Sequence, residues 1–205
     1  MKICKLAPSE HKRGRWLVHL EDGSLLRVGE REVASFGLYT EMELTEQTLE
    51  ALRQAAAAGE AMSHALRLIS VRPLSRRELV QKLSLTSEPQ HAQAAADRLE
   101  ELGYINDEAY ARMVAERYTG KGYGERRLRE ELYRRGVPRE YWDEALAAAA
   151  APEEAIDRFL KKKLAGQTLD DKARKRAADA LARRGYRWDD IKAGLRRFGA
   201  DVTEE

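Results

Sequence analysis

The stretch GERRLREELYRRG, residues 124–136, decides the fold because its pattern returns along the chain. Leu128 and Leu132 have the spacing of one face of an α-helix, and the glycine that follows at Gly136 is a typical helix stop. The same features return 49 residues later and end in Arg183-Arg184-Gly185. An interval of this length accommodates three short helices with their turns, so the pattern indicates a repeat protein.

The same offset of 49 residues also extends the pattern toward the N-terminus. Leu79 precedes Leu128 by this interval, and Leu83 precedes Leu132. We therefore predict a mainly α fold with three tandem three-helix repeats in an elongated, solenoid-like array. The predicted repeats are 60–104, 105–151 and 152–205, the last of which ends in a short acidic tail.

Residues 1–59 have a different pattern and form a predicted N-terminal region. Two short apolar runs, Trp16–Leu20 and Leu25–Val28, flank an Asp-Gly pair, which favours the tight turn of a β-hairpin. A short helix is expected over Glu30–Phe36 and another over Thr45–Ala58. Because a lone hairpin is marginally stable in water, we expect it to pack on the helices.

The glycine-rich sequence TGKGYG, residues 119–124, is either a phosphate-binding loop or a joint between two helices. It contains no G-x-x-x-x-G-K-[ST] or G-x-G-x-x-G motif, and a helical pattern precedes it where a nucleotide loop would follow a strand. The equivalent positions in the other repeats carry the unlike sequences Pro73-Leu74-Ser75 and Asp171-Lys172-Ala173. These observations favour the helix joint.

The sequence offers little for catalysis or metal binding. Cys4 is the only cysteine, which excludes an intrachain disulfide and a thiolate cluster, and the four histidines are scattered. We predict no enzymatic activity, no cofactor and no metal. There is no signal-peptide pattern and no apolar run of about 18 residues, so we expect a cytoplasmic monomer that does not enter the membrane.

Positive charge is concentrated near the C-terminus. The formal net charge is only +2, but residues 157–197 contain 14 basic and 6 acidic residues. The repeat also places Arg127 and Arg134 at positions equivalent to Arg176 and Arg183, on the helix side opposite the buried leucines. Two interpretations remain open: a ligand-binding face, or a soluble surface stabilised by Glu–Arg pairs worth a few tenths of a kcal/mol each.

Several linked motifs resemble one known family. They are ALRLISVRPLSRRELVQKL (65–83), AADRLEELGYINDEAYARMVAERY (95–118) and GKGYGERRLREELYRRGVP (120–138), with looser matches in AIDRFLKKKL (155–164) and ARRGYRWDDIKAGL (182–195). On these residues the chain resembles the RecX family, bacterial modulators of the RecA recombinase. The resemblance covers about residues 60–199, and the N-terminal hairpin is similar to an extension found in some members.

The resemblance implies a helical-repeat protein that lodges in the groove of the RecA–DNA filament and suppresses strand exchange and ATP hydrolysis. The implied partners are the RecA filament and single- and double-stranded DNA, the DNA being bound more weakly or through RecA. The alternative is a DNA-binding helical-repeat protein without sequence specificity that acts independently of RecA.

The candidate filament-binding residues combine the basic positions with one aromatic residue at an exposed turn, Tyr123, for which stacking on a base and packing between helices are both open. They are Lys121, Tyr123, Arg126, Arg127, Arg134, Arg135, Lys161, Lys162, Lys172, Arg176, Arg183 and Arg184.

Overall fold

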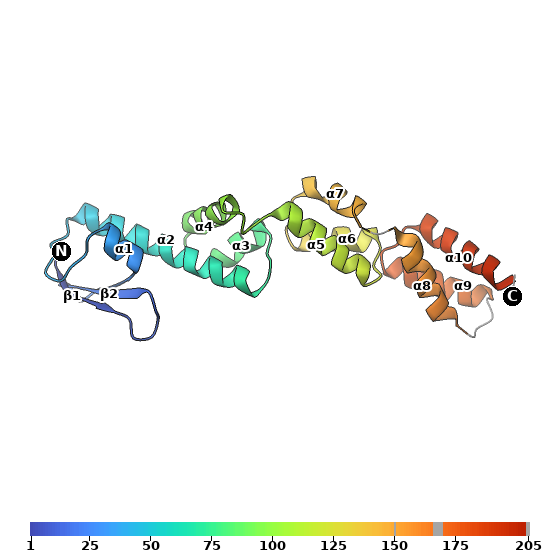
Figure 1. Cartoon of the computed structure of the whole chain (residues 1–205), viewed down its shortest axis with the longest axis horizontal. Coiled ribbons are helices and arrows are strands. Elements are labelled where there is room, and N and C mark those ends of the chain that lie inside the picture. The colour runs from blue at the N-terminus through green and yellow to red at the C-terminus, as the bar shows by residue number, and fades with distance from the viewer. Residues whose placement is uncertain (150, 166–169, 204–205) are drawn as a thin grey trace. The chain divides into compact units, whose positions relative to one another are not determined.

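In the computed structural model the chain folds into two compact units (Figure 1). The structure describes residues 1–149, 151–165 and 170–203. The first unit comprises Met1–Leu74 and Glu78–Ile105, and the second comprises Ser75–Arg77 and the chain from Asn106 onward. The predicted class, a mainly helical fold with a small N-terminal sheet, is confirmed.

The first unit contains a three-stranded antiparallel sheet in the order β1-β2-β3 and most of the first four helices. Its elements are β1 (Ile3–Pro8), β2 (Arg15–Leu20), β3 (Leu25–Gly29), α1 (Glu30–Ser35), α2 (Glu46–Val71), α3 (Arg76–Leu83, whose first two residues belong to the second unit) and α4 (Pro89–Glu101).

The predicted hairpin is confirmed as β2 and β3. Gly23 in its turn has a φ of +82°, and the Ser24 amide donates a 2.8 Å hydrogen bond to the Asp22 carboxylate. Strand β1 was not predicted. Its pairing with β2 has a register shift between Ile3 and Lys5. Ile3 is also the one buried residue of the strand, so buried and exposed residues do not alternate along it as they do in a typical strand.

Helix α2 is longer than predicted, because it continues through Gly59 to Val71 as one helix of 26 residues. Its start is confirmed: the Thr45 hydroxyl accepts a 3.1 Å hydrogen bond from the Thr48 amide. Gly59 does not end the helix. A Cβ added there would lie 3.3 Å from a carboxylate oxygen of Glu32, so the glycine allows α1 to pack closely on α2.

The buried side chains of the first unit form two cores, and α2 contributes to both. Leu52 and Ala56 belong to the core beneath the sheet and α1. Ala61 and Ala65, one or two turns further along the same helix, belong to the core with α3 and α4. The predicted domain boundary at residues 59 and 60 thus falls inside one helix, and the fourfold division of the chain stays a prediction.

The second unit contains two three-helix repeats, each with its own apolar core. Side chains cap two of its helices: Asn106 Oδ1 accepts a 2.8 Å hydrogen bond from the Ala109 amide, and Asp170 Oδ1 accepts one of 2.6 Å from the Ala173 amide. The elements are α5 (Asp107–Gly120), α6 (Glu125–Arg134), η1 (Arg139–Tyr141), α7 (Trp142–Ala147), α8 (Pro152–Leu164), α9 (Asp171–Arg183) and α10 (Trp188–Thr203).

The glycine-rich sequence joins α5 to α6, as predicted, and it also forms the contact between the two repeats of this unit. The Gly124 amide donates a 2.9 Å hydrogen bond to the Arg184 carbonyl, and the Arg126 amide donates one of 3.0 Å to the Gly185 carbonyl. A Cβ at Gly124 would lie 2.4 Å from the backbone nitrogen of Tyr186, and one at Gly185 would lie 2.5 Å from that of Arg127. We call this backbone contact the repeat joint.

An equivalent joint lies 49 residues earlier and is also contained in the second unit. The Ser75 hydroxyl donates a 2.5 Å hydrogen bond to the Arg135 carbonyl, and a Cβ at Gly136 would lie 2.9 Å from the Arg77 side chain. The Arg-Arg-Gly turn at the end of each middle helix therefore packs on the start of the preceding middle helix. This contact explains why the turn recurs in the sequence.

We expect Gly124→Ala to destabilise the second unit by about 1–3 kcal/mol, because the added methyl group meets backbone atoms that cannot move without opening the repeat joint. Urea unfolding followed by circular dichroism measures the loss. Gly120→Ala is the matched control, since nothing lies within 4 Å of a Cβ at that helical glycine. Equal stability of the two variants would contradict a close-packed joint.

Candidate binding surface

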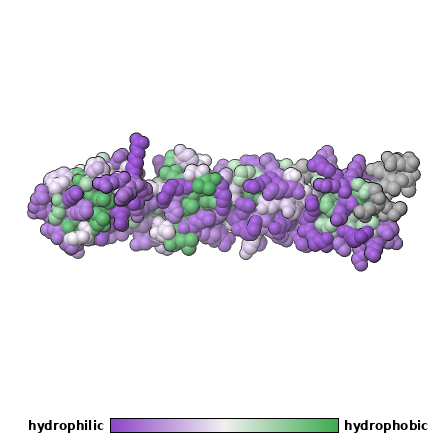
Figure 2. Space-filling view, turned by 90° about the horizontal axis from the view of Figure 1, so that it is seen from below, coloured by the Kyte–Doolittle hydropathy of each residue, from purple (hydrophilic) through white to green (hydrophobic). Residues whose placement is uncertain are grey.

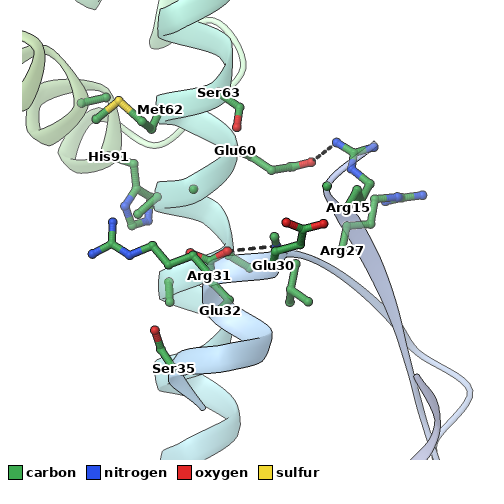
Figure 3. A pocket seen from close by; sticks show the side chains of 18 of the residues that line it. Arg15, Arg27, Glu30, Arg31, Glu32, Ser35, Glu60, Met62, Ser63 and His91 are labelled. Carbon is green, nitrogen blue, oxygen red and sulfur yellow. Dashed lines mark hydrogen bonds and ion pairs between the residues drawn. The ribbon is translucent and has the colours of Figure 1, made fainter. Parts of the chain in front are cut away.

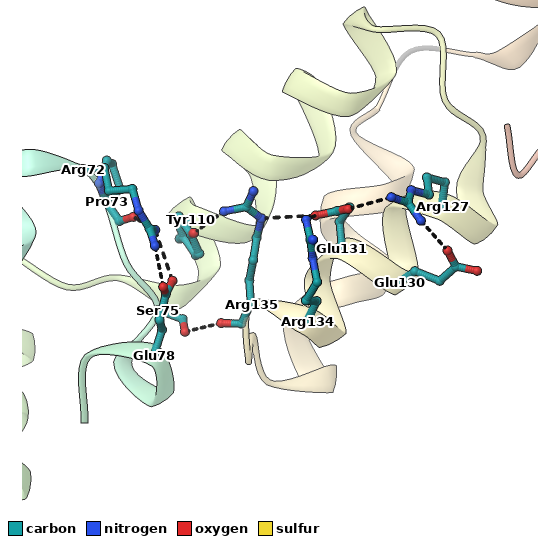
Figure 4. Close-up of polar contacts among 10 residues, drawn as sticks. All are labelled: Arg72, Pro73, Ser75, Glu78, Tyr110, Arg127, Glu130, Glu131, Arg134 and Arg135. Atoms are coloured by element: carbon teal, nitrogen blue, oxygen red, sulfur yellow. Dashed lines mark hydrogen bonds and ion pairs between the residues drawn. The ribbon is translucent and has the colours of Figure 1, made fainter. Parts of the chain in front are cut away.

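The predicted basic residues of α6 surround a buried carboxylate (Figure 4). Glu131 is 2% exposed. Its Oε1 atom lies 3.2 Å from the Arg127 guanidinium, and its Oε2 atom accepts a 2.5 Å hydrogen bond from Arg134. Arg135 Nε lies 3.6 Å from the same carboxylate, and Arg127 also contacts Glu130 at 3.1 Å. Arg127, Arg134 and Arg135 are thus held by an acid that the chain itself supplies.

Burial raises the pKa of Glu131, but hydrogen bonds from Arg134 and Tyr118 and the charges of Arg134 and Arg127 lower it more, so that it lies below its ordinary value. The carboxylate is therefore ionised at neutral pH. The same hydrogen bond raises the pKa of Arg134. The negative charge of Glu131 therefore partly neutralises the positive charges of the arginines around it.

Helix α9 retains the arginines of this cluster but lacks its acid. The offset of 49 residues places Ala180 at the position of Glu131, with Arg176 four residues before it and Arg183 three residues after it. Beside Ala180 there is a hollow of about 290 Å³, which is also lined by both arginines and by Lys163 from α8. We call this hollow the α9 anion hollow.

The cations of the α9 anion hollow form no ion pair within the described ranges. Asp179 also lines the hollow, but neither it nor any other described acid forms an ion pair with Lys163, Arg176 or Arg183. Lys172, at the start of α9, is likewise exposed and unpaired among the described residues. Arg176 and Arg183 are the repeat equivalents of Arg127 and Arg134, which hold the Glu131 carboxylate. An anion from outside the chain would therefore meet the same pair of arginines here.

The other predicted residues have different surroundings. Arg184 supports the repeat joint: its guanidinium stacks on Phe159 at 4.7 Å and donates a 3.3 Å hydrogen bond to the Gly122 carbonyl. Lys121 lies 5.3 Å from the Tyr118 ring, and Tyr123 packs against the same ring at 5.7 Å, partly covered by the core.

Arg135 donates a 3.0 Å hydrogen bond to the Tyr110 hydroxyl, and Arg126 lies 3.6 Å from Glu130. Lys161 and Lys162 are exposed on α8. Of the twelve predicted residues, the structure brings Arg176 and Arg183 together at the α9 anion hollow, whereas those on α6 and at the turns mainly contact other parts of the chain.

Sequence reasoning missed the parts played by Glu131, Ala180 and Lys163. A signal was present for the first two, because Glu131 lies four residues after Arg127 and three before Arg134, and the repeat offset aligns it with an alanine. Helical periodicity predicts which side of a helix a charged residue occupies, but not that its carboxylate is buried among arginines. Lys163 comes from another helix, and its proximity depends on tertiary packing.

Neither a metal site nor a membrane span is found in the parts of the chain that the structure describes. No three His, Cys, Asp or Glu side chains there are placed to hold a metal ion. None of the described helices combines the length and the apolar character needed to cross a bilayer. Hydrophilic residues cover much of the face shown in Figure 2, with hydrophobic patches between them.

Sequence comparisons match this fold to one family. Residues 106–146 match the family model described as "RecX, second three-helix domain". The regulatory protein RecX of Xanthomonas axonopodis pv. citri is 38% identical over 138 residues, which are 66% of this chain and 85% of that protein. The regulatory protein RecX of Thermus thermophilus is 39% identical over 127 residues, which are 62% of this chain and 84% of that protein.

Solved structures agree on the fold. A crystal structure of regulatory protein RecX superposes with a TM-score of 0.72 at 21% identity, covering 94% of this chain and 98% of that one. A RecX crystal structure from Lactobacillus salivarius superposes with a TM-score of 0.64 at 18% identity, covering 70% of this chain and 97% of that one.

The helical repeats, together with relatives that are named regulatory proteins, define the class as a helical-repeat regulatory protein. Within that class, the chain belongs to the RecX family.

We expect Glu131→Gln to lower the free energy of unfolding by about 1–2 kcal/mol at pH 7, because it removes charge-assisted hydrogen bonds whose arginines are partly exposed. Since the pKa of Glu131 is lowered by folding, its contribution is present above the ordinary glutamate pKa of about 4.3 and is lost as pH falls through the folded-state value. Unfolding in urea at a series of pH values measures the difference between wild type and variant.

That difference should shrink in acid. Glu130→Gln is the control, because Glu130 makes comparable helix-surface contacts while being half exposed, and should cost only a few tenths of a kcal/mol. A loss that is equal for both variants, or one that does not change with pH, would contradict the structural importance of the buried carboxylate.

Proposed function

We propose that this chain regulates a RecA-type recombinase by binding the RecA–DNA filament and lowering its ATPase and strand-exchange activities, without catalysing a reaction itself. Membership of the RecX family, whose relatives are named regulatory proteins, supports a regulatory role. The site accords with this role, since it consists of helix-borne cations on a repeat scaffold.

The α9 anion hollow is the observation that carries the binding part of the proposal. Lys163, Arg176 and Arg183 line one hollow without an internal acid paired to them in the described chain, whereas the corresponding arginines of α6 are occupied by Glu131. Cations in this state attract the phosphates of DNA or the carboxylates of an acidic protein surface, both of which a nucleoprotein filament offers. We infer that the third repeat contacts the filament more strongly than the second.

The proposal is tested by titrating the protein into RecA that hydrolyses ATP on single-stranded DNA. We expect ATP hydrolysis to fall at amounts of the protein below that of RecA, and binding to naked DNA at two salt concentrations to be weaker than binding to the filament. Unchanged ATP hydrolysis with the protein in excess would refute regulation of RecA. If this result came with tight, steeply salt-dependent binding to naked DNA, the alternative of an independent DNA-binding protein would take its place.

We expect Ala180→Glu to weaken filament binding about tenfold, because its carboxylate would occupy the α9 anion hollow and pair with Arg176 and Arg183 as Glu131 does with its arginines. Fluorescence anisotropy of labelled filaments measures the affinity. Ala180→Gln is the matched control, since it has the same shape without the charge and should bind nearly as wild type does. Equal weakening by both variants would make steric blocking, not charge, the cause.

A further inference from the structure

The first unit contains a pocket that the proposed function does not use (Figure 3). Its volume of about 630 Å³ lies within the range of small-ligand pockets. It is bounded by the β1–β2 loop, β3, α1, the middle of α2 and the start of α4, all within the same unit.

The pocket collects the positive charge of the N-terminal region. Residues 1–64 contain eight basic and ten acidic residues, so this segment as a whole is slightly acidic. Five of the eight basic residues nevertheless line this one pocket, against three of the ten acids. The five are Lys12, Arg13, Arg15, Arg27 and Arg31. The pocket lining therefore has two more basic than acidic residues, in a segment that has two more acidic than basic residues.

Most of these cations are not neutralised by the pocket's own acids. Arg15 pairs with Glu60 at 2.6 Å, and the Glu32 carboxylate accepts a 2.9 Å hydrogen bond from the Gly29 amide. The other four cations form no ion pair with any acid among the residues that the structure describes. Burial lowers the pKa of Lys12, and the charges of Arg15 and Arg67 lower it further against the opposing charge of Glu60.

The remaining walls supply apolar surface and one unsatisfied polar group. Val28, Ala56 and Ala95 are buried residues of the floor. His91 from α4 has a solvent-shielded Nε2 atom without a hydrogen-bond partner in the described chain, and its nearest acid, Glu88, is 4.0 Å away. Arg31 and His91 lie on the α4 side of the pocket, and Arg15 and Arg27 lie on the hairpin side (Figure 3).

From this arrangement we propose that the pocket binds a small phosphate-bearing ligand with a planar or apolar body, which is the chemistry of a nucleotide. Lys12, Arg27 and Arg31 hold the phosphate groups, and the floor covers the apolar body. His91 borders the same space from α4. This site is separate from the α9 anion hollow, since the two share no residue.

The test measures binding of a fluorescent adenine nucleotide, mant-ADP, to the full chain by anisotropy, with competition by pyrophosphate and by an eight-nucleotide oligothymidylate. We expect saturable binding of mant-ADP, displacement by pyrophosphate at higher concentration, and a dissociation constant raised about tenfold by Arg31→Ala and by Arg27→Ala. Arg53→Ala, on the exposed side of α2 and outside the pocket, is the control and should bind as wild type does.

Three results overturn the proposal. The first is the absence of saturable mant-ADP binding by the wild-type chain. The second is binding that Arg27→Ala and Arg31→Ala leave unchanged while each variant keeps the wild-type circular dichroism spectrum. The third is displacement by the oligonucleotide but not by pyrophosphate or unlabelled ADP. This result would mean that the pocket recognises the phosphates of a nucleic-acid strand and not those of a small ligand.

Discussion

The close approach of two backbones at the repeat joint is the constraint on which the second unit depends. Gly124 and Gly185 lie where any side chain would strike main-chain atoms, and the amides and carbonyls around them complete each other's hydrogen bonds. A contact made by backbone tolerates little sliding or rotation, because its hydrogen bonds are directional. The joint therefore fixes the directions in which α6 and α9 present their side chains.

On this shared scaffold the two helices differ at a position that is an acid in α6 and an alanine in α9. In α6 the arginines contact Glu131, which is buried and ionised. In α9 an alanine stands at the same position and the arginines line an open hollow. One residue thus decides whether the arginines of a repeat contact an internal carboxylate or line an open hollow, while the helix and its apolar core are retained.

The parts of the fold encoded by local pattern were predictable, and those that depend on distant partners were not. Leu128, Leu132 and Gly136 mark a helix and its end within a few residues, and the same holds for the hairpin turn at Gly23. Strand β1 exists through pairing with β2 and has little pattern of its own. For the candidate binding surface, the sequence predicted Arg176 and Arg183, whose role stays a prediction, but the hollow that they line also depends on Lys163 of α8.

Helix α2 joins the two cores of the first unit without a break. At about 1.5 Å per residue its 26 residues form a rod about 39 Å long, with Leu52 in one core and Ala65 in the other. If α2 unfolded in one core, apolar side chains of the other core would also become exposed. The sheet and the first repeat should therefore unfold as a single cooperative block, and amide protons along α2 should exchange at similar rates on both sides of Gly59.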